Sequence, residues 1–557
     1  RTDVALAYMR LKHPGTQWTV TSDYQTKHNG VEHVYLRQVI NGITIVNAVA
    51  NINILNGMIL NMGHTVYDIS RGTPEMPPSE LPFGHLTPQK ALYAVLDHVK
   101  RTDKASMETP ETSFSYIILE SGELALAHRL VVDLHDDVYE SYVDVQTGEV
   151  HGLYNWVQSE APTNAEYTAY QYPITDPGKG TGERSNLMNP WQSFGDASPE
   201  GYHDQGTGEI YHVTIGNNVY AQENRDGSSS WMNNYRPDGG NPSQGLLFSF
   251  PIDFGQEPRQ YEDAAISNLF YWNNLIHDLF HIGGFDEASG NFQENNWGRG
   301  GLGNDAVQAN AQDGAGFNNA NFYTPPDGQR PRMRMYLWTS ATPRIDGDLD
   351  SGIIVHEYGH GISNRLTGGP SVVNCLRSGQ SGGMGEGWGD WWAVMLETQA
   401  SDTASSSFPM GVYATKNPKG IRNFPYSYDM NTNPQTFKYI SESGYSGVHA
   451  KGSVWCEILF NVYWELRTAN GYDPDWINGK GGNNVIWQNV IDGLKLQPCN
   501  PDFVQARDAI IEADKINFGG VNVCTMWKGF ARRGLGVNAV ATSNPVREDF
   551  TTPSECQ

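Results

Sequence analysis

The sequence predicts an α+β protein of several domains, in which small α+β units precede a larger part that is first rich in strands and then mainly helical. The 557 residues exceed what one compact domain usually holds. Residues 33–60 alternate apolar and polar side chains, a pattern typical of half-buried strands. After residue 350 the apolar residues recur every three or four positions, which is the period of a helix.

The first unit is expected over residues 1–75. Its strands, in the segment HVYLRQVINGITIVNAVANINILNGMIL, are interrupted by Asn41-Gly42 and Asn56-Gly57. These dipeptides favour the tight turns of β-hairpins because both residues tolerate a positive φ. A Pro-rich segment, residues 72–84, follows and is expected to be a linker.

A second α+β unit is expected over residues 76–164. In LTPQKALYAVLDHVKR, Thr87 is placed to cap a helix and Pro88 to occupy its first turn. Two strand-like segments follow, LALAHRLVVDL and VYESYVDVQTGEVHGLY, the second with a turn at Thr147-Gly148. The polar, Pro- and Gly-rich stretch from residue 158 to 182 then predicts a domain boundary between residues 160 and 165.

The larger part is expected to divide into residues 165–366 and 367–557. The first of these regions is rich in Gly and Asn and has short strand signals such as PRMRMYLW. In the second, GSVWCEILFNVYWELRTANG has the apolar stripe of a buried helix. A further helix is expected in NPDFVQARDAIIEADKIN, with Asn500 as its N-cap and Pro501 in its first turn.

The composition excludes some classes of function. Lys and Arg total 37 against 62 Asp and Glu, a net charge of −25, and contact with nucleic-acid phosphates needs a basic face. No apolar run approaches the ~20 residues of a membrane helix. The first residues lack the pattern of a signal peptide, so a secreted form would already have lost its signal. The five cysteines form no Cys-x-x-Cys pair, which predicts one or two disulfides with a spare thiol, and Cys456 is expected to be buried.

The segment SGIIVHEYGHGISNRLTGGP, residues 351–370, predicts a metal site on a helix. His356 and His360 are four residues apart, so on a helix they lie about 40° apart and about 6 Å along the axis. Both imidazoles can then bind one zinc ion. Glu357 is close enough to touch a water on that ion without being a ligand. Asp348 and Asp350 are expected to cap this helix, and Gly368-Gly369-Pro370 to end it.

A third protein ligand is expected from GGMGEGWGDWWAVMLE. Glu386 follows His360 by 26 residues, and Asp390 follows one turn later on the same helix face. Asp390 can therefore hold the free ring N–H of a ligand histidine. Gly385 and Gly389 are expected to let this helix approach the metal helix closely. The tryptophans at positions 388, 391 and 392 are expected in the core.

A second histidine pair with the same spacing, His277 and His281, lies in LIHDLFHIGGF. Asp278 stands where the metal motif has glutamate, and no acidic helix follows at a similar distance. This pair is therefore expected to be structural.

With these residues established, the chain resembles the precursor of a fungalysin-type metalloprotease, a relative of the thermolysin-like gluzincins. The resemblance rests on HEYGHGISNRLTGG, GGMGEGWGD, NNANFYTPPDGQRPRMRMYLW, LFYWNNLIHDLFH and GVHAKGSVW, with VYLRQVINGITIVNAVANINI matching the propeptide module. It implies a prosegment followed by a two-lobed thermolysin-like catalytic domain, with a β-rich lobe at 165–366 and a helical lobe at 367–557.

The resemblance also implies roles for single residues. His356, His360 and Glu386 become zinc ligands, Glu357 the general base, and Asp390 the partner of a ligand histidine. His449 matches a histidine that meets the developing oxyanion. Asn319 and Ala320 match an edge strand that holds substrate, Asn319 by its side-chain amide and Ala320 by its backbone.

Three positions depart from the family pattern. The aspartate that orients the oxyanion histidine in relatives is replaced by Gly444, so Glu442 is a candidate for that task. Gly359 and Lys451 are also atypical. These departures concern fine specificity more than chemistry.

The prediction is a secreted zinc metalloendopeptidase in zymogen form, with one catalytic Zn²⁺ and calcium left undecided. Its partners would be protein or peptide substrates and its own prosegment as an intramolecular inhibitor, with no nucleic acid or membrane, and the chain would be a monomer. Residues 1–160 contain no cysteine, so a thiolate on the zinc cannot be the inhibitor. The resemblance implies instead that the prosegment blocks the cleft sterically and also assists folding. The alternatives are a zinc aminopeptidase and a non-catalytic zinc-containing binding protein.

Overall fold

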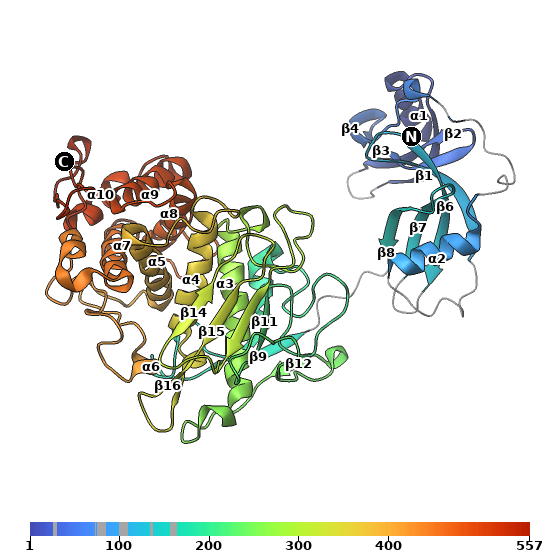
Figure 1. Ribbon diagram of the computed structural model, residues 1–557. Coiled ribbons are helices and arrows are strands. Elements are labelled where there is room, and N and C mark those ends of the chain that lie inside the picture. The colour runs from blue at the N-terminus through green and yellow to red at the C-terminus, as the bar shows by residue number, and fades with distance from the viewer. Residues whose placement is uncertain (26–29, 73, 75–84, 100–109, 134–137, 156–163) are drawn as a thin grey trace. The chain divides into compact units, whose positions relative to one another are not determined.

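The computed structural model describes residues 1–25, 30–72, 74, 85–99, 110–133, 138–155 and 164–557. The chain divides into two compact units, residues 1–159 and 160–557, and each is described by itself (Figure 1). Both units contain sheets and helices, so the predicted α+β class is confirmed. Most of the expected linker at 72–84 lies outside the described residues.

The first unit is built on a single sheet of eight strands in the order β1-β2-β3-β5-β6-β7-β8, with β4 paired to β3. Adjacent strands are antiparallel except β3 and β5, which meet in parallel at Ile45 and Tyr116. The strands are β1 (Gln17–Gln25), β2 (Glu32–Ile40), β3 (Ile43–Leu55), β4 (Met58–His64), β5 (Thr112–Ile118), β6 (Leu124–Asp133), β7 (Val138–Asp144) and β8 (Val150–Asn155).

The predicted turns and helix of this unit are confirmed. Asn41 and Gly42 have φ of 53° and 79° between β2 and β3, and Asn56 and Gly57 have 53° and 76° between β3 and β4. Helix α2 (Pro88–His98) begins after Thr87, whose Oγ1 accepts a hydrogen bond from the N–H of Lys90. Because the sheet is continuous, the two predicted α+β units share one sheet.

Each half of that sheet has a separate core. Helix α1 (Thr2–Lys12) contributes Ala5 and Met9 to a cluster with apolar residues of β2 and β3. Helix α2 contributes Leu92 and Val95 to a second cluster with residues of β6 and β7. The helices therefore bury the apolar positions that the sequence alternation predicts.

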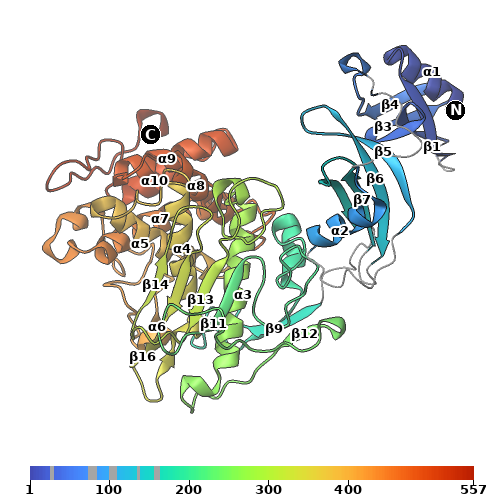
Figure 2. The ribbon, with the colours of Figure 1, turned by 45° about the vertical axis from the view of Figure 1, so that its right-hand side comes forward.

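The second unit begins with strands and one long helix. Three small sheets have the orders β10-β9-β12, β11-β13-β15-β14 and β16-β17. Helix α3 (Glu262–Ile282) is buried over most of its length and packs against β9, β11 and β13 (Figure 2). The strands are β9 (Ala165–Ala169), β10 (Ser185–Met188), β11 (Val219–Glu223), β12 (Leu246–Phe248), β13 (Val307–Ala311), β14 (Ala320–Tyr323), β15 (Arg332–Met335), β16 (Leu337–Trp338) and β17 (Ile345–Asp346).

The rest of this unit is mainly helical. Its helices are α4 (Ser351–Leu366), α5 (Gly379–Glu397), α6 (Val412–Thr415), α7 (Val448–Asn470), α8 (Gly482–Leu496), α9 (Phe503–Phe518) and α10 (Val523–Arg532). Short 3-10 turns include η7 (Gly347–Leu349), η8 (Phe437–Ser441) and η9 (Ser443–Tyr445). The expected core tryptophans 388, 391 and 392 are at most 1% exposed. In the described part of the chain, no helix is both long and apolar enough to cross a membrane.

The predicted start of the helix near residue 500 is wrong. Helix α9 begins at Phe503, and its N-cap is Asp502 instead of Asn500. The Asp502 carboxylate accepts from the N–H of Gln505 at 2.9 Å, and the Gln505 side chain accepts from the N–H of Asp502 at 3.0 Å. This reciprocal pair satisfies two helix donors, which a cap at residue 500 would leave open.

The cysteines form two disulfides and one free thiol. Cys375 bonds to Cys499 and Cys524 to Cys556. Cys456 is free and buried, as the sequence predicts.

Candidate active site and metal centre

Helix α4 carries the predicted metal motif in a buried setting. His356 is 7% exposed and Glu357 is 6% exposed. The rings of His356 and His360 have centroids 4.8 Å apart and lie nearly perpendicular, at 88°. The helix ends at Leu366 and is followed by Gly368 and Gly369 with φ of 84° and 87°, so its predicted end is confirmed.

The capping prediction for α4 is only partly right. Asp350 holds the N-cap position, but its carboxylate accepts a hydrogen bond from the N–H of Ala414 instead of from its own helix. Asp348 lies in η7, and its carboxylate accepts from the N–H of Gln312. Both carboxylates therefore tie other segments to the start of the metal helix.

Helix α5 approaches α4 so closely that only glycine fits at their crossing. A Cβ added to Gly389 would lie 2.8 Å from Nδ1 of His356, and one added to Gly359 would lie 3.0 Å from Cα of Gly389. Gly359, atypical for the family pattern, therefore faces the glycine of the partner helix. The expectation for Gly385 is wrong, because its nearest neighbour would be Leu376 at an ordinary 3.7 Å.

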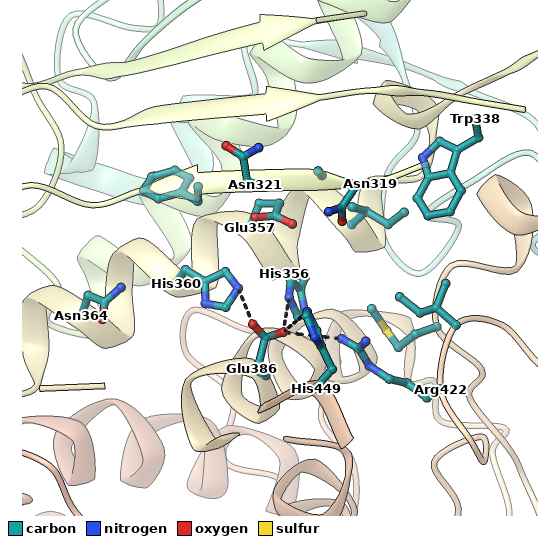
Figure 3. Close-up of a pocket in the computed structure, with 15 residues that line it drawn as sticks. Asn319, Asn321, Trp338, His356, Glu357, His360, Asn364, Glu386, Arg422 and His449 are labelled. Carbon is teal, nitrogen blue, oxygen red and sulfur yellow. Dashed lines mark ion pairs between the residues drawn. The ribbon is translucent and has the colours of Figure 1, made fainter. Parts of the chain in front are cut away.

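This approach brings three predicted ligands together (Figure 3). His356 Nε2 lies 3.4 Å from Glu386 Oε2, and His360 Nε2 lies 3.7 Å from Glu386 Oε1. Their ligand atoms all lie within 4.8 Å of one another, and no other group of three such residues does so in the described ranges. Glu386 Oε2 is buried without a hydrogen bond, as expected of an oxygen reserved for a cation.

Asp390 fixes the orientation of His356. Its Oδ1 lies 2.7 Å from Nδ1 of His356, so Nε2 of the ring is free to face Glu386. Arg422 donates to both carboxylate oxygens of Asp390, from Nε at 2.6 Å and from Nη2 at 2.8 Å. Tyr426 donates its hydroxyl to the same carboxylate. Sequence reasoning missed Arg422 and Tyr426, since they lie more than 30 residues away and carry no motif.

The charges of the cluster favour a cation at its centre. Burial lowers the pKa of His356, but Asp390 and Glu386 outweigh burial and raise it to about 10. Burial raises the pKa of Glu386, but the neighbouring histidines outweigh burial and lower it to about 2. Two histidines and one ionised carboxylate form a donor set that suits zinc in a site with an open position. The residues present therefore fit the predicted metal.

Glu357 faces the same cleft beside the ligands (Figure 3). Burial, which is the largest influence, raises the pKa of its carboxyl to about 7. A carboxylate with a pKa near neutrality can both accept and return a proton at that pH.

His449 is the second residue of α7 and extends into the cleft. Its side chain is 66% exposed, and Nε2 lies 3.2 Å from Oε2 of Glu386. The candidate role of Glu442 is wrong, because within the described residues Glu442 forms no hydrogen bond or ion pair with His449. Glu442 is instead the exposed N-cap residue of η9.

The cleft has a volume of about 410 Å³ and is bordered by the strand β14. This strand is the last of its sheet and pairs with β15 on one side. Asn319 directly precedes β14 and lines the cleft (Figure 3). Ala320 begins the strand and lines the cleft as well. Apolar side chains not singled out from the sequence also line it: Trp338, Ile353, Met410 and Ile421.

The second histidine pair lies on α3 and is satisfied by its surroundings. His277 is 1% exposed, with Nδ1 2.9 Å from Asp278 and Nε2 3.3 Å from the Asn291 side chain. His281 Nε2 lies 3.0 Å from Glu287. The prediction that this pair is structural agrees with these contacts.

Comparison with known proteins follows the same division of the chain. Residues 166–539 match the family model described as Fungalysin metallopeptidase (M36), and residues 16–66 match the Fungalysin/Thermolysin Propeptide Motif. Extracellular metalloproteinase 2 of Trichophyton tonsurans is 40% identical over 98% of this chain and 88% of that protein. Extracellular metalloproteinase MEP of Pyricularia oryzae is 39% identical over 99% of this chain and 89% of that protein.

A solved structure, the precursor of protealysin, a metalloproteinase from Serratia proteamaculans, covers 60% of this chain and 92% of its own. It is 14% identical, with a TM-score of 0.38. The family model alone covers more than half of the sequence, and the relatives align along nearly all of it. This chain therefore belongs to the fungalysin family of metallopeptidases.

Proposed function

We propose that this protein is a secreted zinc metalloendopeptidase made as a latent precursor. The observation that carries the proposal is the meeting of His356, His360 and Glu386 in a cleft that the buried carboxylate of Glu357 also faces. A purely structural zinc site usually has four protein ligands and has no use for such a base. The names of the relatives, extracellular metalloproteinases, support secretion.

A zinc ion bound by the three ligands would lower the pKa of a water molecule and polarise the carbonyl of the peptide bond. Glu357 takes the proton of the attacking water on its carboxylate and passes it to the leaving nitrogen. Its pKa of about 7 suits both steps. No covalent bond forms between the protein and the substrate.

Two further residues assist this chemistry. His449 donates its ring N–H to the carbonyl oxygen as negative charge develops there, and removal of one such donor typically costs about 10²–10³-fold in rate. Asp390 holds His356 in the tautomer that leaves Nε2 free for the metal. Arg422 in turn fixes Asp390 through two hydrogen bonds.

The substrate binds as an additional strand along β14. A sheet edge offers unpaired backbone groups to an extended peptide. The backbone of Ala320 and the side-chain amide of Asn319 make these contacts beside the metal ligands. A peptide laid along an edge can extend past the cut bond in both directions, and this supports an endopeptidase over an aminopeptidase.

The test is cleavage of a denatured protein by residues 165–557, with and without a chelator. Activity should disappear with the chelator and return with added Zn²⁺. Peptides blocked at both ends should be cut as fast as unblocked ones. Activity that persists without metal, or that requires a free amino terminus, would contradict the proposal.

The first unit is proposed to keep the enzyme latent. Its propeptide motif supports this role, and its lack of cysteine excludes inhibition by a thiolate on the metal. The intact chain should cleave protein substrates more slowly than residues 165–557. Equal rates would leave the first unit a folding aid only.

A further inference from the structure

The prosegment contains a histidine pair whose rings are arranged like those of the metal ligands. His13 and His64 have ring centroids 4.6 Å apart with an interplanar angle of 77°. The corresponding values for His356 and His360 are 4.8 Å and 88°. The two pairs differ in origin, because His13 and His64 come from distant positions in the sequence.

The distance between the ring nitrogens suits joint metal binding. His13 Nε2 and His64 Nε2 lie 3.4 Å apart and face each other. Two nitrogens bound to one tetrahedral zinc ion at 2.0–2.1 Å are themselves about 3.4 Å apart. Without a metal ion, one of these two nitrogens donates a hydrogen bond to the other. A bound metal ion would replace that hydrogen bond.

Both histidines are held in place through the backbone. His13 follows the last residue of α1, its N–H donates to the Met9 carbonyl, and its own carbonyl accepts from the Thr16 hydroxyl at 2.7 Å. His64 is the last residue of β4 and is paired with Ala50 of β3. The site is therefore pre-organised by a helix end and a strand end, which lowers the entropic cost of binding.

The surroundings leave access for an ion and its water ligands. His64 is exposed and borders a hollow of about 650 Å³ on the first unit. Burial, the facing ring of His64 and the ammonium of Lys12 all lower the pKa of His13. The positive charge of Lys12 would repel a metal ion bound to His13.

We propose that His13 and His64 form a second zinc site, in which water completes the coordination and the ion links α1 to β4. Imidazole nitrogen is a preferred ligand of zinc, and a site with two such ligands should bind zinc more weakly than the catalytic site with three. This site belongs to the prosegment and would be absent from the processed enzyme.

Equilibrium dialysis of the full chain against Zn²⁺ at pH 7.5 tests the proposal. We expect two bound equivalents in the parent chain and one in His13→Gln or in His64→Gln. The matched control His98→Gln, at an exposed histidine of α2, should keep two. In a His356→Gln background one equivalent should remain, and adding His13→Gln should remove it.

Hydrogen exchange provides an independent readout. Zn²⁺ should slow exchange of amides at the end of α1 and in β4 in the parent chain but not in His64→Gln. Lys12→Gln should bind the second equivalent more tightly, because the opposing charge is gone. A single equivalent in the parent chain, or a second one that survives both histidine substitutions, would overturn the proposal.

Discussion

Helices α3 and α4 carry histidine pairs of the same spacing, yet only the pair on α4 forms part of a metal cluster. On α3, His277 and His281 have ring centroids 5.8 Å apart and an interplanar angle of 34°. Each is engaged by its own neighbours, Asp278 and Asn291 for the first and Glu287 for the second. On α4, the rings lie at 88° and converge on Glu386.

The difference lies in the partner helix more than in the motif. Helix α5 reaches α4 at Gly389 and Gly359, where a side chain on either residue would collide with the other helix. This contact places Glu386 beside both rings and Asp390 behind one of them. A spacing of four residues therefore places two histidines on one helix face. The glycine contact between α4 and α5 then brings Glu386 close enough to act as the third ligand.

The largest effect is expected from substitutions of the second histidine in each pair. His360→Gln removes one of the three proposed protein ligands and should abolish zinc binding at the catalytic site and, with it, peptidase activity. His281→Gln, its matched control, should leave both intact, since Nε2 of this ring pairs with Glu287 and not with a residue of the candidate metal site. Metal analysis and cleavage assays measure the outcome. Loss of zinc in His281→Gln would show that the two pairs are not independent.

The next comparison is between Glu357 and Asp278, the acidic residues that directly follow the first histidine of each pair. Glu357→Gln should keep zinc bound while kcat falls by about 10²–10⁴-fold, because the proposed general base is lost. Asp278→Asn on α3 should retain activity per folded molecule. It should instead lose stability, because Ser198 and Tyr202 donate to this carboxylate. Substantial turnover in Glu357→Gln would refute the assignment of the base.

One added methyl group should disturb the contact between α4 and α5. Gly389→Ala places a methyl group 2.8 Å from His356 Nδ1 and should destabilise the protein by about 1–3 kcal/mol and weaken zinc binding. The control Gly385→Ala has room and should raise stability by up to ~1 kcal/mol through helix propensity. Thermal unfolding and chelator competition distinguish the two variants. Equal behaviour would mean that the crossing is not tight.

The last comparison concerns the starts of the two helices. The first-turn carboxylates of α3, Glu262 and Asp263, are partly exposed, whereas Asp350 before α4 is buried. Burial and then the Asp176 carboxylate raise the pKa of Asp350 to about 8. This is above its value in the unfolded chain, so its contribution to stability is complete below about pH 4 and is lost as pH rises through 8.

Asp350→Asn keeps an acceptor for the Ala414 N–H and has no charge to bury. Between pH 5 and pH 9, urea unfolding should show a smaller loss of stability in this variant than in the parent. The expected difference is on the order of 1–3 kcal/mol. Parallel pH profiles would exclude Asp350 as the source.

Much of the candidate site could be predicted from local sequence. The histidine spacing and the residues at its ends predicted α4, and the period of the apolar residues predicted α7. The Asn-Gly pairs predicted the hairpins of β2, β3 and β4. The cap near residue 500 was misplaced because Asn500 and Asp502 are both good caps, and only the reciprocal bond with Gln505 decides between them. The role of Arg422 could not be predicted, because it depends on a contact with Asp390 that only the folded structure reveals.

By itself, the sequence determined which residues share a helix face, because the rotation per residue of a helix is fixed. That rule placed His356 with His360 and Glu386 with Asp390. Only the tertiary structure decided that these faces meet, that Arg422 and Tyr426 hold Asp390, and that the pair on α3 is satisfied elsewhere. The physical reason is that burial and distances between elements depend on packing across the whole unit, which a local period does not encode.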